Sequence, residues 1–381
     1  MGLYIWWLDL ITKNKTKMKT ILCLIDILGF GGGAERQMIG LVQLLKERGY
    51  AVDVVVYHDS KDLEEIKRRY NLDPILLKVK NNPLSKLLAV RRFILQRGGF
   101  DIVIAYKGGP CIIGCILKIM RMRFKLIVSE RIVTQVIDRL FKIKCFLYRF
   151  ADVIVPNSYS QGTFIAKHFP YLANKISVIT NFTDTVYFSP DNTVPSNKNL
   201  YVLTVARITP QKNILNYLEA IYLLRQKGIT DVFFHWVGGA QNPNDEQYSR
   251  IVQQKVKELG LETVLTFHGQ TRDIIEYYPK CDIFCLPSSF EGFPNVVCEA
   301  MSCGKPIACS RVCDNPRIVS ESVNGLLFDP CDPKDIADKL KELIDMPEDM
   351  RKDWGRKSRT IALEMFSREA FVDKYISIIE R

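Results

Sequence analysis

The chain has 381 residues, enough for two domains, and 47% of them are hydrophobic, enough for two buried cores. Charged residues make up 25%, which argues against a disordered chain, and no apolar run reaches the roughly 20 residues that a membrane-spanning helix needs. The net charge is +11, and the basic excess lies in residues 1–190. Such an excess suggests an anionic partner, either a membrane surface, a phosphorylated lipid or a nucleic acid, unless it consists only of scattered solvated lysines.

The eleven cysteines and four histidines predict neither a disulfide framework nor a metal site. The cysteine count is odd, the spacings are irregular and no C-x-x-C pair occurs, which favours reduced thiols in a cytosolic protein. The histidines are isolated from one another and lack the spacing of ligand pairs, so we expect no bound metal.

Residues 1–17 allow two interpretations. Met1–Ile11 is apolar and aromatic and is followed by lysines, so it could lie in a membrane interface. Alternatively, Met18 is a true start just before the first buried strand, and residues 1–17 are an extension without a structural role. We favour the second interpretation.

The first half of the chain alternates short runs rich in Val and Ile with longer amphipathic segments. Such runs fit parallel strands covered on both faces, and the alternation predicts a doubly wound α/β domain. The predicted strands are Ile21–Ile25, Val52–Tyr57, Asp101–Ala105, Leu126–Ser129 and Asp152–Pro156. The predicted helices are Ala34–Arg48, Leu84–Gln96, Gln135–Arg149 and Ser158–His168.

A segment without periodicity, residues 181–199, interrupts this pattern and reads as a linker. A second alternating series follows, which predicts a second domain of the same class. We therefore expect an N-terminal Rossmann-like domain over residues 18–190 and a C-terminal one over residues 191–364. The final amphipathic helix, 365–381, could pack back onto the first domain.

The glycine-rich loop Gly29–Ala34 follows the first predicted strand and opens a helix. Glycines let the backbone approach a ligand closely, and a helix N-terminus favours an anion. The string also matches G-x-G-x-x-A, a form of the dinucleotide fingerprint. However, the second strand ends at Tyr57-His58, without the acidic residue that this fingerprint expects. The loop is therefore either a ligand loop or a tight turn.

Two cations, Arg207 and Lys212, lie on the loop after the first strand of the second domain. A guanidinium and an ammonium five residues apart can both reach one diphosphate. The alternative is two surface cations near a helix start. That position is electrostatically unfavourable unless an anion is present, which favours the diphosphate site.

The most specific segment is Ser288–Met301. It follows strand Asp282–Leu286, contains the loop Gly292-Phe293-Pro294-Asn295 and leads into a helix, so its amides face the crevice where open α/β sheets bind ligands. Glu291 lies in the loop and Glu299 about one turn into the helix. Two carboxylates at this spacing can accept hydrogen bonds from sugar hydroxyls, which suits a nucleotide sugar better than an ordinary helix start.

Glu291-x₇-Glu299, with the Gly-Phe-Pro-Asn loop between them, resembles the signature of family-4 retaining glycosyltransferases. Other segments also resemble those of the family and occur in the same order along the chain. This combination makes the resemblance specific, and it covers the chain from Met18 to the C-terminus. These segments are Gly31–Arg36, Asn181–Asp184 with Phe188, Arg207 with Lys212, Val237–Gly239 and Phe267–Gly269.

The resemblance implies two Rossmann-like domains of the GT-B type that face a central cleft. It implies that Glu291 contacts the donor pyranose and Glu299 the ribose, while Arg207 and Lys212 stabilise the leaving diphosphate. It also implies same-face substitution with retained configuration and no metal ion or other cofactor, with which the lack of an Asp-x-Asp string agrees. The further donor contacts that it implies are Gly31, Gly32, Gly33, Gly239, Gly292, Phe293, Pro294, Asn295 and Val296.

One departure concerns the first domain. Many relatives carry a histidine near the donor sugar, whereas the matching region here, Ala105–Pro110, has none. The neighbouring Ser129-Glu130-Arg131 is similar to a string in relatives that extend lipid-linked glycans. Glu130 and Arg131 are therefore either acceptor or sugar contacts or a salt-bridged strand end, and Arg36 is a further candidate contact.

The leading hypothesis is a hexosyl- or N-acetylhexosaminyl-transferase of bacterial surface polysaccharide synthesis. The donor would be a UDP- or GDP-sugar, and the acceptor a lipid-linked glycan at the inner face of the cytoplasmic membrane, where the protein would be peripheral. The alternatives are a sugar-nucleotide epimerase of the same architecture and a non-catalytic nucleotide-sugar binder. Nucleic-acid binding is less favoured because no aromatic and basic readout motif occurs.

Overall fold

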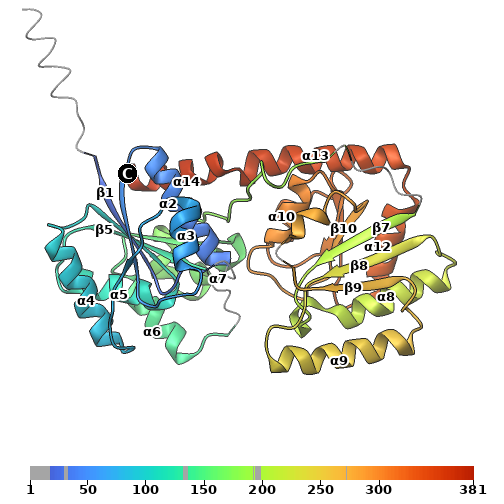
Figure 1. Cartoon of the computed structure of the whole chain (residues 1–381), viewed down its shortest axis with the longest axis horizontal. Helices are drawn as coiled ribbons and strands as arrows, with labels where there is room; N and C mark the ends of the chain where they lie inside the picture. Colours follow the sequence, from blue (N-terminus) through green and yellow to red (C-terminus); the bar gives the residue numbers. More distant parts are fainter. Residues whose placement is uncertain (1–17, 30–32, 132–135, 192, 194–198, 272) are drawn as a thin grey trace, which may run out of the picture. The chain divides into compact units, whose positions relative to one another are not determined.

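The computed structural model describes residues 18–29, 33–131, 136–191, 193, 199–271 and 273–381. The chain forms two compact units (Figure 1). The first comprises the residues up to 157 together with 161–179 and 372–381, and the second comprises 158–160 and 180–371. The predicted boundary near residue 190 therefore lies within the second unit. Of the predicted tail 365–381, residues 372–381 belong to the first unit.

The first unit is built on a six-stranded parallel sheet with the order β3-β2-β1-β4-β5-β6. Its central strands are buried along almost their whole length, as expected for continuous apolar runs between two helix layers. The strands are β1 (Thr20–Ile25), β2 (Ala51–Val56), β3 (Ile75–Leu76), β4 (Ile102–Tyr106), β5 (Lys125–Glu130) and β6 (Val153–Pro156). The helices are α2 (Gly33–Glu47), α3 (Leu63–Tyr70), α4 (Pro83–Gln96), α5 (Gly108–Ile119), α6 (Arg139–Tyr148), α7 (Tyr159–His168) and the 3₁₀ helix η1 (Pro170–Lys175).

The second unit repeats this topology with the sheet order β12-β11-β10-β7-β8-β9, again all parallel. Its strands are β7 (Leu200–Val205), β8 (Val232–Val237), β9 (Leu265–Gly269), β10 (Ile283–Leu286), β11 (Ile307–Ser310) and β12 (Gly325–Phe328). Its helices are η2 (Pro210–Lys212), α8 (Ile214–Gln226), α9 (Pro243–Glu258), η3 (Ile274–Glu276), α10 (Asn295–Ser302), α11 (Asn315–Ile318), α12 (Pro333–Asp345) and α13 (Glu348–Phe366). The last helix, α14 (Arg368–Glu380), begins in this unit and ends in the first.

Local sequence explains where several helices begin. Asn82, Asp138, Asn242 and Asp332 each precede a helix, and each side chain accepts a hydrogen bond from a backbone N–H of the first turn. A proline follows in the first turn of α4, α9 and α12, where its missing N–H costs nothing. Helix starts of this kind fix where each crossover returns to the sheet.

The C-terminal end of α14 is fastened to the first unit by polar contacts. The Tyr375 and Tyr106 hydroxyls lie 2.9 Å apart, and the Arg131 guanidinium donates to both. Arg48 and Asp373 form an ion pair at 2.8 Å near the surface. The last ten residues therefore complete the first unit, although they follow the whole of the second unit in the sequence.

The predicted fold class is confirmed, because both sheets are parallel, doubly wound and covered by helices. In each sheet the strand order reverses once, between β1 and β4 and between β7 and β10. Ligands of open α/β sheets bind at such a switch point, outside the carboxyl ends of the strands. In the second unit the predicted donor segments follow β7 and β10. Within the described ranges, no helix combines the length and apolar character needed to cross a bilayer.

Candidate active site

The loops after β7 and β10 are joined to each other by hydrogen bonds. Ser289 N–H donates to the Gln211 carbonyl at 2.8 Å, and the Gln211 side chain donates to the Phe290 carbonyl at 3.0 Å. Asn213 sits between η2 and α8 with a left-handed backbone (φ 56°), and its amide donates to the carbonyls of Pro287 and Pro330. These bonds place the two segments that the sequence singled out side by side at the switch point.

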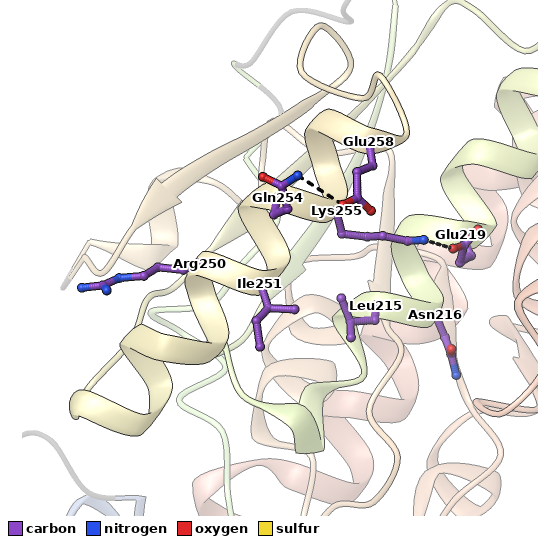
Figure 2. Close-up of a pocket in the computed structure, with 8 residues that line it drawn as sticks. All are labelled: Leu215, Asn216, Glu219, Arg250, Ile251, Gln254, Lys255 and Glu258. Atoms are coloured by element: carbon purple, nitrogen blue, oxygen red, sulfur yellow. Dashed lines mark hydrogen bonds and ion pairs between the residues drawn. The ribbon is translucent and has the colours of Figure 1, made fainter.

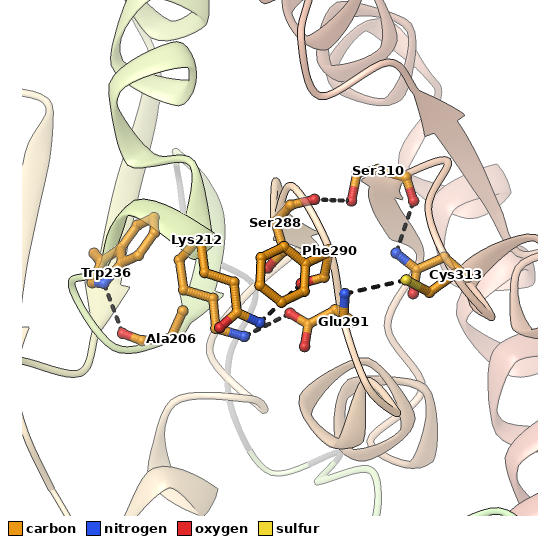
Figure 3. A network of polar contacts seen from close by, with 10 residues as sticks. Ala206, Lys212, Trp236, Ser288, Phe290, Glu291, Ser310 and Cys313 are labelled. Carbon is orange, nitrogen blue, oxygen red and sulfur yellow. Dashed lines mark hydrogen bonds and ion pairs between the residues drawn. The ribbon is translucent and has the colours of Figure 1, made fainter. Parts of the chain in front are cut away.

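Lys212 and Glu291 meet across this junction. The lysine Nζ lies 2.6 Å from Glu291 Oε1, as drawn in Figure 3. The side chains are only 14% and 8% exposed, so the pair is largely shielded from water. Removing one partner of such a shielded pair leaves the other charge uncompensated, which is more costly than breaking a surface ion pair. The structure thus brings together a cation and a carboxylate that lie 79 positions apart in the chain.

Arg207 lies five positions before Lys212 and is exposed. Its side chain makes no hydrogen bond or ion pair with the described part of the chain, so its guanidinium can meet a ligand without first leaving a protein partner. The neighbouring backbone is tightly packed: Trp236 Nε1 donates to the Ala206 carbonyl at 2.8 Å. Gly238 (φ 130°) approaches so closely that a Cβ would lie 2.1 Å from the Ala206 oxygen. Close approach therefore requires glycine at 238, whereas Gly239 has ordinary space around it.

Glu291 is held from its other side by the loop after β11. Its backbone N–H points at the Cys313 sulfur, 3.4 Å away, and Cys313 itself has a left-handed backbone (φ 50°). Ser310 donates from its hydroxyl to the Ser288 carbonyl at 2.6 Å, which ties the β10 and β11 loops together (Figure 3). The buried Ser288 hydroxyl has no partner among the described residues. Glu291 thus projects from a loop that is fixed on both flanks.

The predicted helix start is found at α10, one residue after Pro294. The Asn295 side chain accepts from the Asn181 amide at 2.8 Å, and the Phe293 ring packs against Phe366 at 5.7 Å between centroids. Gly292 and Val296 are half-buried. The loop therefore contributes to the core of the second unit as well as to its carboxyl edge.

Glu299 lies on the first turns of α10 and is buried. The Tyr278 hydroxyl donates to its Oε2 at 2.8 Å. Burial, and then the neighbouring Glu299 charge, raise the pKa of Tyr278 well above its ordinary value. The phenol therefore stays protonated at neutral pH and keeps donating to the carboxylate. Tyr278 is a positioning residue that sequence reasoning missed.

Replacing Tyr278 with phenylalanine removes this hydrogen bond and retains the ring. If Glu299 holds the ribose, UDP should bind about three- to tenfold more weakly, the loss expected for one hydrogen bond. Titration calorimetry with UDP measures this. Tyr277→Phe is the matched control, because this half-buried ring contacts His268 and not Glu299. Equal affinities for Tyr278→Phe and the wild type would contradict the positioning role.

Of the site residues predicted in the first unit, Gly31 and Gly32 lie outside the described residues, and Gly33 opens α2. Arg36 is exposed on that helix. Its neighbour Glu35 is buried and forms an ion pair with Lys107, just after β4. Lys107 has φ 70° and ψ 168°, a conformation that only glycine adopts readily. A strained cation thus stands in the region where relatives carry a histidine.

Glu130 and Arg131 are both engaged within the first unit. Glu130 is fully buried and pairs with Lys144 at 2.7 Å and with the Tyr148 hydroxyl at 2.9 Å. Its second carboxylate oxygen has no partner among the described residues. Arg131 donates to Ser129 at 2.8 Å and to the two tyrosines that anchor α14. In this structure, the contacts of the two side chains correspond to the second alternative, a salt-bridged and hydrogen-bonded strand end.

A separate hollow of about 620 Å³ lies between α8 and α9 (Figure 2). Leu215 and Ile251 form its apolar floor, and a Lys255–Glu219 ion pair at 2.6 Å closes one side. None of its lining residues belongs to the loops that carry Lys212 or Glu291. In the described ranges, no group of three or more His, Cys, Asp or Glu is arranged to hold a metal ion.

Two family models between them match residues 31–361. The model described as Glycosyltransferase Family 4 matches residues 31–187, and the one described as Glycosyl transferases group 1 matches residues 188–361. The chain belongs to the family-4 glycosyltransferases. The group 1 model covers the whole junction of Lys212, Glu291 and Glu299, so these residues lie in the part of the chain that is matched to glycosyltransferases.

Curated relatives of this glycosyltransferase include bacterial proteins. An uncharacterised glycosyltransferase of Haemophilus influenzae is 26% identical over 345 residues, which are 87% of this chain and 92% of the relative. An Escherichia coli enzyme named UDP-Gal:alpha-D-GlcNAc-diphosphoundecaprenol alpha-1,3-galactosyltransferase is 31% identical over 181 residues, which are 45% of this chain and 46% of the relative.

Solved structures share the fold of this glycosyltransferase. The Anabaena protein HepE, determined in complex with UDP and glucose, matches with a TM-score of 0.80 and 21% identity over 96% of this chain and all of that one. At this level of identity the likeness establishes the fold, and the predicted GT-B type of architecture is confirmed.

Proposed function

We propose that this glycosyltransferase transfers a hexosyl or N-acetylhexosaminyl residue from a UDP- or GDP-sugar to a lipid-linked glycan, with retained configuration, during bacterial surface polysaccharide synthesis. The observation that carries the proposal is the shielded Lys212–Glu291 pair beside the exposed Arg207, at the carboxyl ends of β7 and β10. It offers two cations to a diphosphate and a carboxylate to a sugar.

The charges of this site suit departure of a diphosphate. As the glycosidic bond breaks, negative charge grows on the leaving phosphate oxygens, and fixed cations stabilise that charge most when water is excluded. Lys212 is largely shielded and Arg207 is exposed, so the lysine provides the preorganised charge and the arginine reaches out to the incoming donor. We propose that this pair replaces a divalent metal ion in the reaction.

Lys212 is paired with Glu291. Donor binding must therefore exchange the carboxylate for a phosphate as the partner of the lysine, which frees Glu291 to accept hydrogen bonds from sugar hydroxyls. Glu299, positioned by Tyr278, would take the ribose. The acceptor hydroxyl would attack from the face that the diphosphate leaves, with a phosphate oxygen taking its proton.

The proposed acceptor is a glycan on a lipid diphosphate at the inner face of the cytoplasmic membrane. Two observations support it: the E. coli relative is named for a diphosphoundecaprenol-linked acceptor, and the basic excess lies in the first half of the chain. The name of the same relative contains UDP-Gal and an alpha linkage, which supports a UDP-sugar donor and retention.

A donor screen with purified protein tests the proposal. We expect one nucleotide sugar to raise the melting temperature, EDTA to leave that shift unchanged, and product to form only with a diphospho-lipid-linked sugar acceptor. Interconversion of the nucleotide sugar without acceptor would instead identify an epimerase, and binding without turnover would identify a non-catalytic binder. A shift that disappears with EDTA would contradict metal-independent diphosphate binding.

A further inference from the structure

Helix α6 is apolar on both its inner and its outer face. Its inner residues Phe141 and Cys145 are buried in the first unit. On the outer face Leu140, Ile143 and Phe146 are 75%, 55% and 52% exposed. Their spacing of three residues places them in one stripe along the helix. A surface helix normally shows polar residues on this side, so the stripe needs a partner or a function.

Helix α4 carries a second stripe of the same kind. Leu84, Leu88 and Leu95 are each more than half exposed and lie on one side of the helix. Helix α5 packs between α4 and α6 on the same side of the sheet (Figure 1), and Ile119 and Met120 are exposed at its end. We define the α4–α6 face as the outer surfaces of α4 and α6 together with the C-terminal end of α5.

The charge of this region is one-sided. Residues 83–150 contain 14 Lys and Arg but only three Asp and Glu, a net charge of +11, which equals that of the whole chain. The three helices themselves contain no Asp or Glu. Each acid of the region already has a partner within the unit: Asp101 bonds Thr20, Glu130 pairs with Lys144, and Asp138 caps α6. Acids from outside the region pair with Lys107, Lys118 and Arg97. The exposed cations of α4 and α6 form no such ion pair among the described residues, so the excess that remains lies on these helices.

The cations lie among the exposed apolar side chains. On α6 the exposed Arg139 and Lys142 alternate with the apolar stripe, and the exposed Arg149 follows the end of the helix. On α4, Arg91 and Arg92 lie between Leu88 and Leu95 in the sequence. Apolar side chains that enter the acyl boundary, with cations at the level of the phosphates, are the features of a helix that binds an anionic lipid surface. A second copy is a poorer partner because it would bring two strongly basic surfaces together.

We propose that the α4–α6 face docks on an anionic lipid bilayer. The proposal rests on the proposed function for its biological setting, a lipid-linked acceptor, but the binding itself needs neither donor nor acceptor. Docking would hold the first unit at the surface on which a lipid diphosphate resides. The face can contribute both hydrophobic and electrostatic binding energy. The leucines and Phe146 supply apolar area, and the arginines supply positive charge.

Co-sedimentation of the full chain with vesicles tests the proposal. We expect binding to vesicles that contain phosphatidylglycerol and phosphatidylcholine, much weaker binding to phosphatidylcholine alone, and a decline with added salt, because the Debye length falls from about 10 Å at 0.1 M to about 3 Å at 1 M. Failure of the wild type to bind anionic vesicles would overturn the proposal.

Two surface variants locate the binding. Arg139→Gln with Lys142→Gln should weaken binding to anionic vesicles about tenfold or more, because each cation near such a surface contributes roughly a fivefold factor. Leu140→Ser with Ile143→Ser and Phe146→Ser should weaken it at least as much, because three inserted side chains lose their apolar contact. All five side chains are exposed, so the fold should persist, and an unchanged melting temperature checks this.

Matched controls come from elsewhere in the chain. Arg250→Gln with Ile251→Ser alters an exposed cation and an exposed apolar residue on α9 (Figure 2) and should leave vesicle binding unchanged. Trp6→Ser with Trp7→Ser tests the apolar N-terminal stretch and should also leave it unchanged. Loss of binding in either control, with the α6 variants binding normally, would overturn the assignment.

Two further readouts separate this proposal from its alternatives. Light scattering without vesicles should show the same mass for the wild type and the α6 apolar variant, whereas a dimer that dissociates in the variant would identify a second copy as the occupant and overturn the lipid assignment. The donor-induced melting shift should be equal in all these variants. If that shift is present and vesicle binding is absent, the docking proposal fails while the proposed function stands.

Discussion

Replacing Glu291 with glutamine should lower transfer by about 10²–10³-fold, the range seen when one preorganised group that stabilises a transition state is removed. At the same time, UDP should bind as well as in the wild type or more tightly. The carboxylate now holds Lys212 at 2.6 Å and competes with the diphosphate for it, and glutamine removes that competing charge. Transfer and nucleotide affinity should thus change in different directions.

This split distinguishes a site residue from a structural one, because a misfolded variant would lose both properties. Steady-state kinetics with the donor that the screen identifies measures transfer, and calorimetry with UDP measures affinity. Glu219→Gln is the matched control, since Glu219 also pairs with a lysine at 2.6 Å in the second unit but lines the hollow between α8 and α9. Near wild-type transfer by Glu291→Gln would contradict the assignment of this residue.

Most of the fold could be predicted from the sequence because its signals are local. Parallel strands buried on both faces read as continuous apolar runs, and β1, β4 and β10 lie within one residue of the predicted ranges. The helix start near Asn295 followed from a proline in a glycine-containing loop. Segment 181–199 has no such periodicity. The change of unit at residues 179 and 180, before this segment, therefore could not be found by pattern.

The sequence predicts the site residues that lie in two short segments, but it does not predict which of them contact one another. Arg207, Lys212, Glu291 and Glu299 lie on the loops after β7 and β10, and the reversal of strand order is what makes these loops neighbours. The pairing of Lys212 with Glu291 is a consequence of this folding and has no counterpart in the sequence. The same holds for Tyr278 and Cys313, which reach the site from other segments through single contacts.

In the first unit, the sequence shows which residues are present but not which of them share a surface or meet in space. The basic excess was visible in the composition, but its concentration around α4, α5 and α6 has meaning only once these helices are known to share a surface. Likewise, the sequence shows that Ala105–Pro110 contains no histidine, but the glycine-like backbone of Lys107 and its ion pair with Glu35 depend on the β4 loop and α2 meeting in space.

Replacing Lys212 with alanine should weaken UDP binding by about tenfold to a hundredfold, the contribution expected of one charge-assisted hydrogen bond to a phosphate. Transfer should fall further than affinity, because the charge on the leaving diphosphate grows toward the transition state and the missing ammonium is felt most there. Lys212→Arg restores the charge on a longer, planar group, so it should recover affinity more than transfer.

Loss of Lys212 also leaves the Glu291 carboxylate shielded and without its cation, so part of the effect could arise from a weakened loop. The double variant Lys212→Ala with Glu291→Gln removes this complication, because neither charge is then left alone. If Lys212 binds the diphosphate directly, the double variant regains the melting temperature but not the affinity for UDP. Recovery of both in the double variant would mean that the lysine acts only by neutralising Glu291. Lys227→Ala, which removes a surface ion pair with Asp338 in the same unit, should leave UDP affinity unchanged.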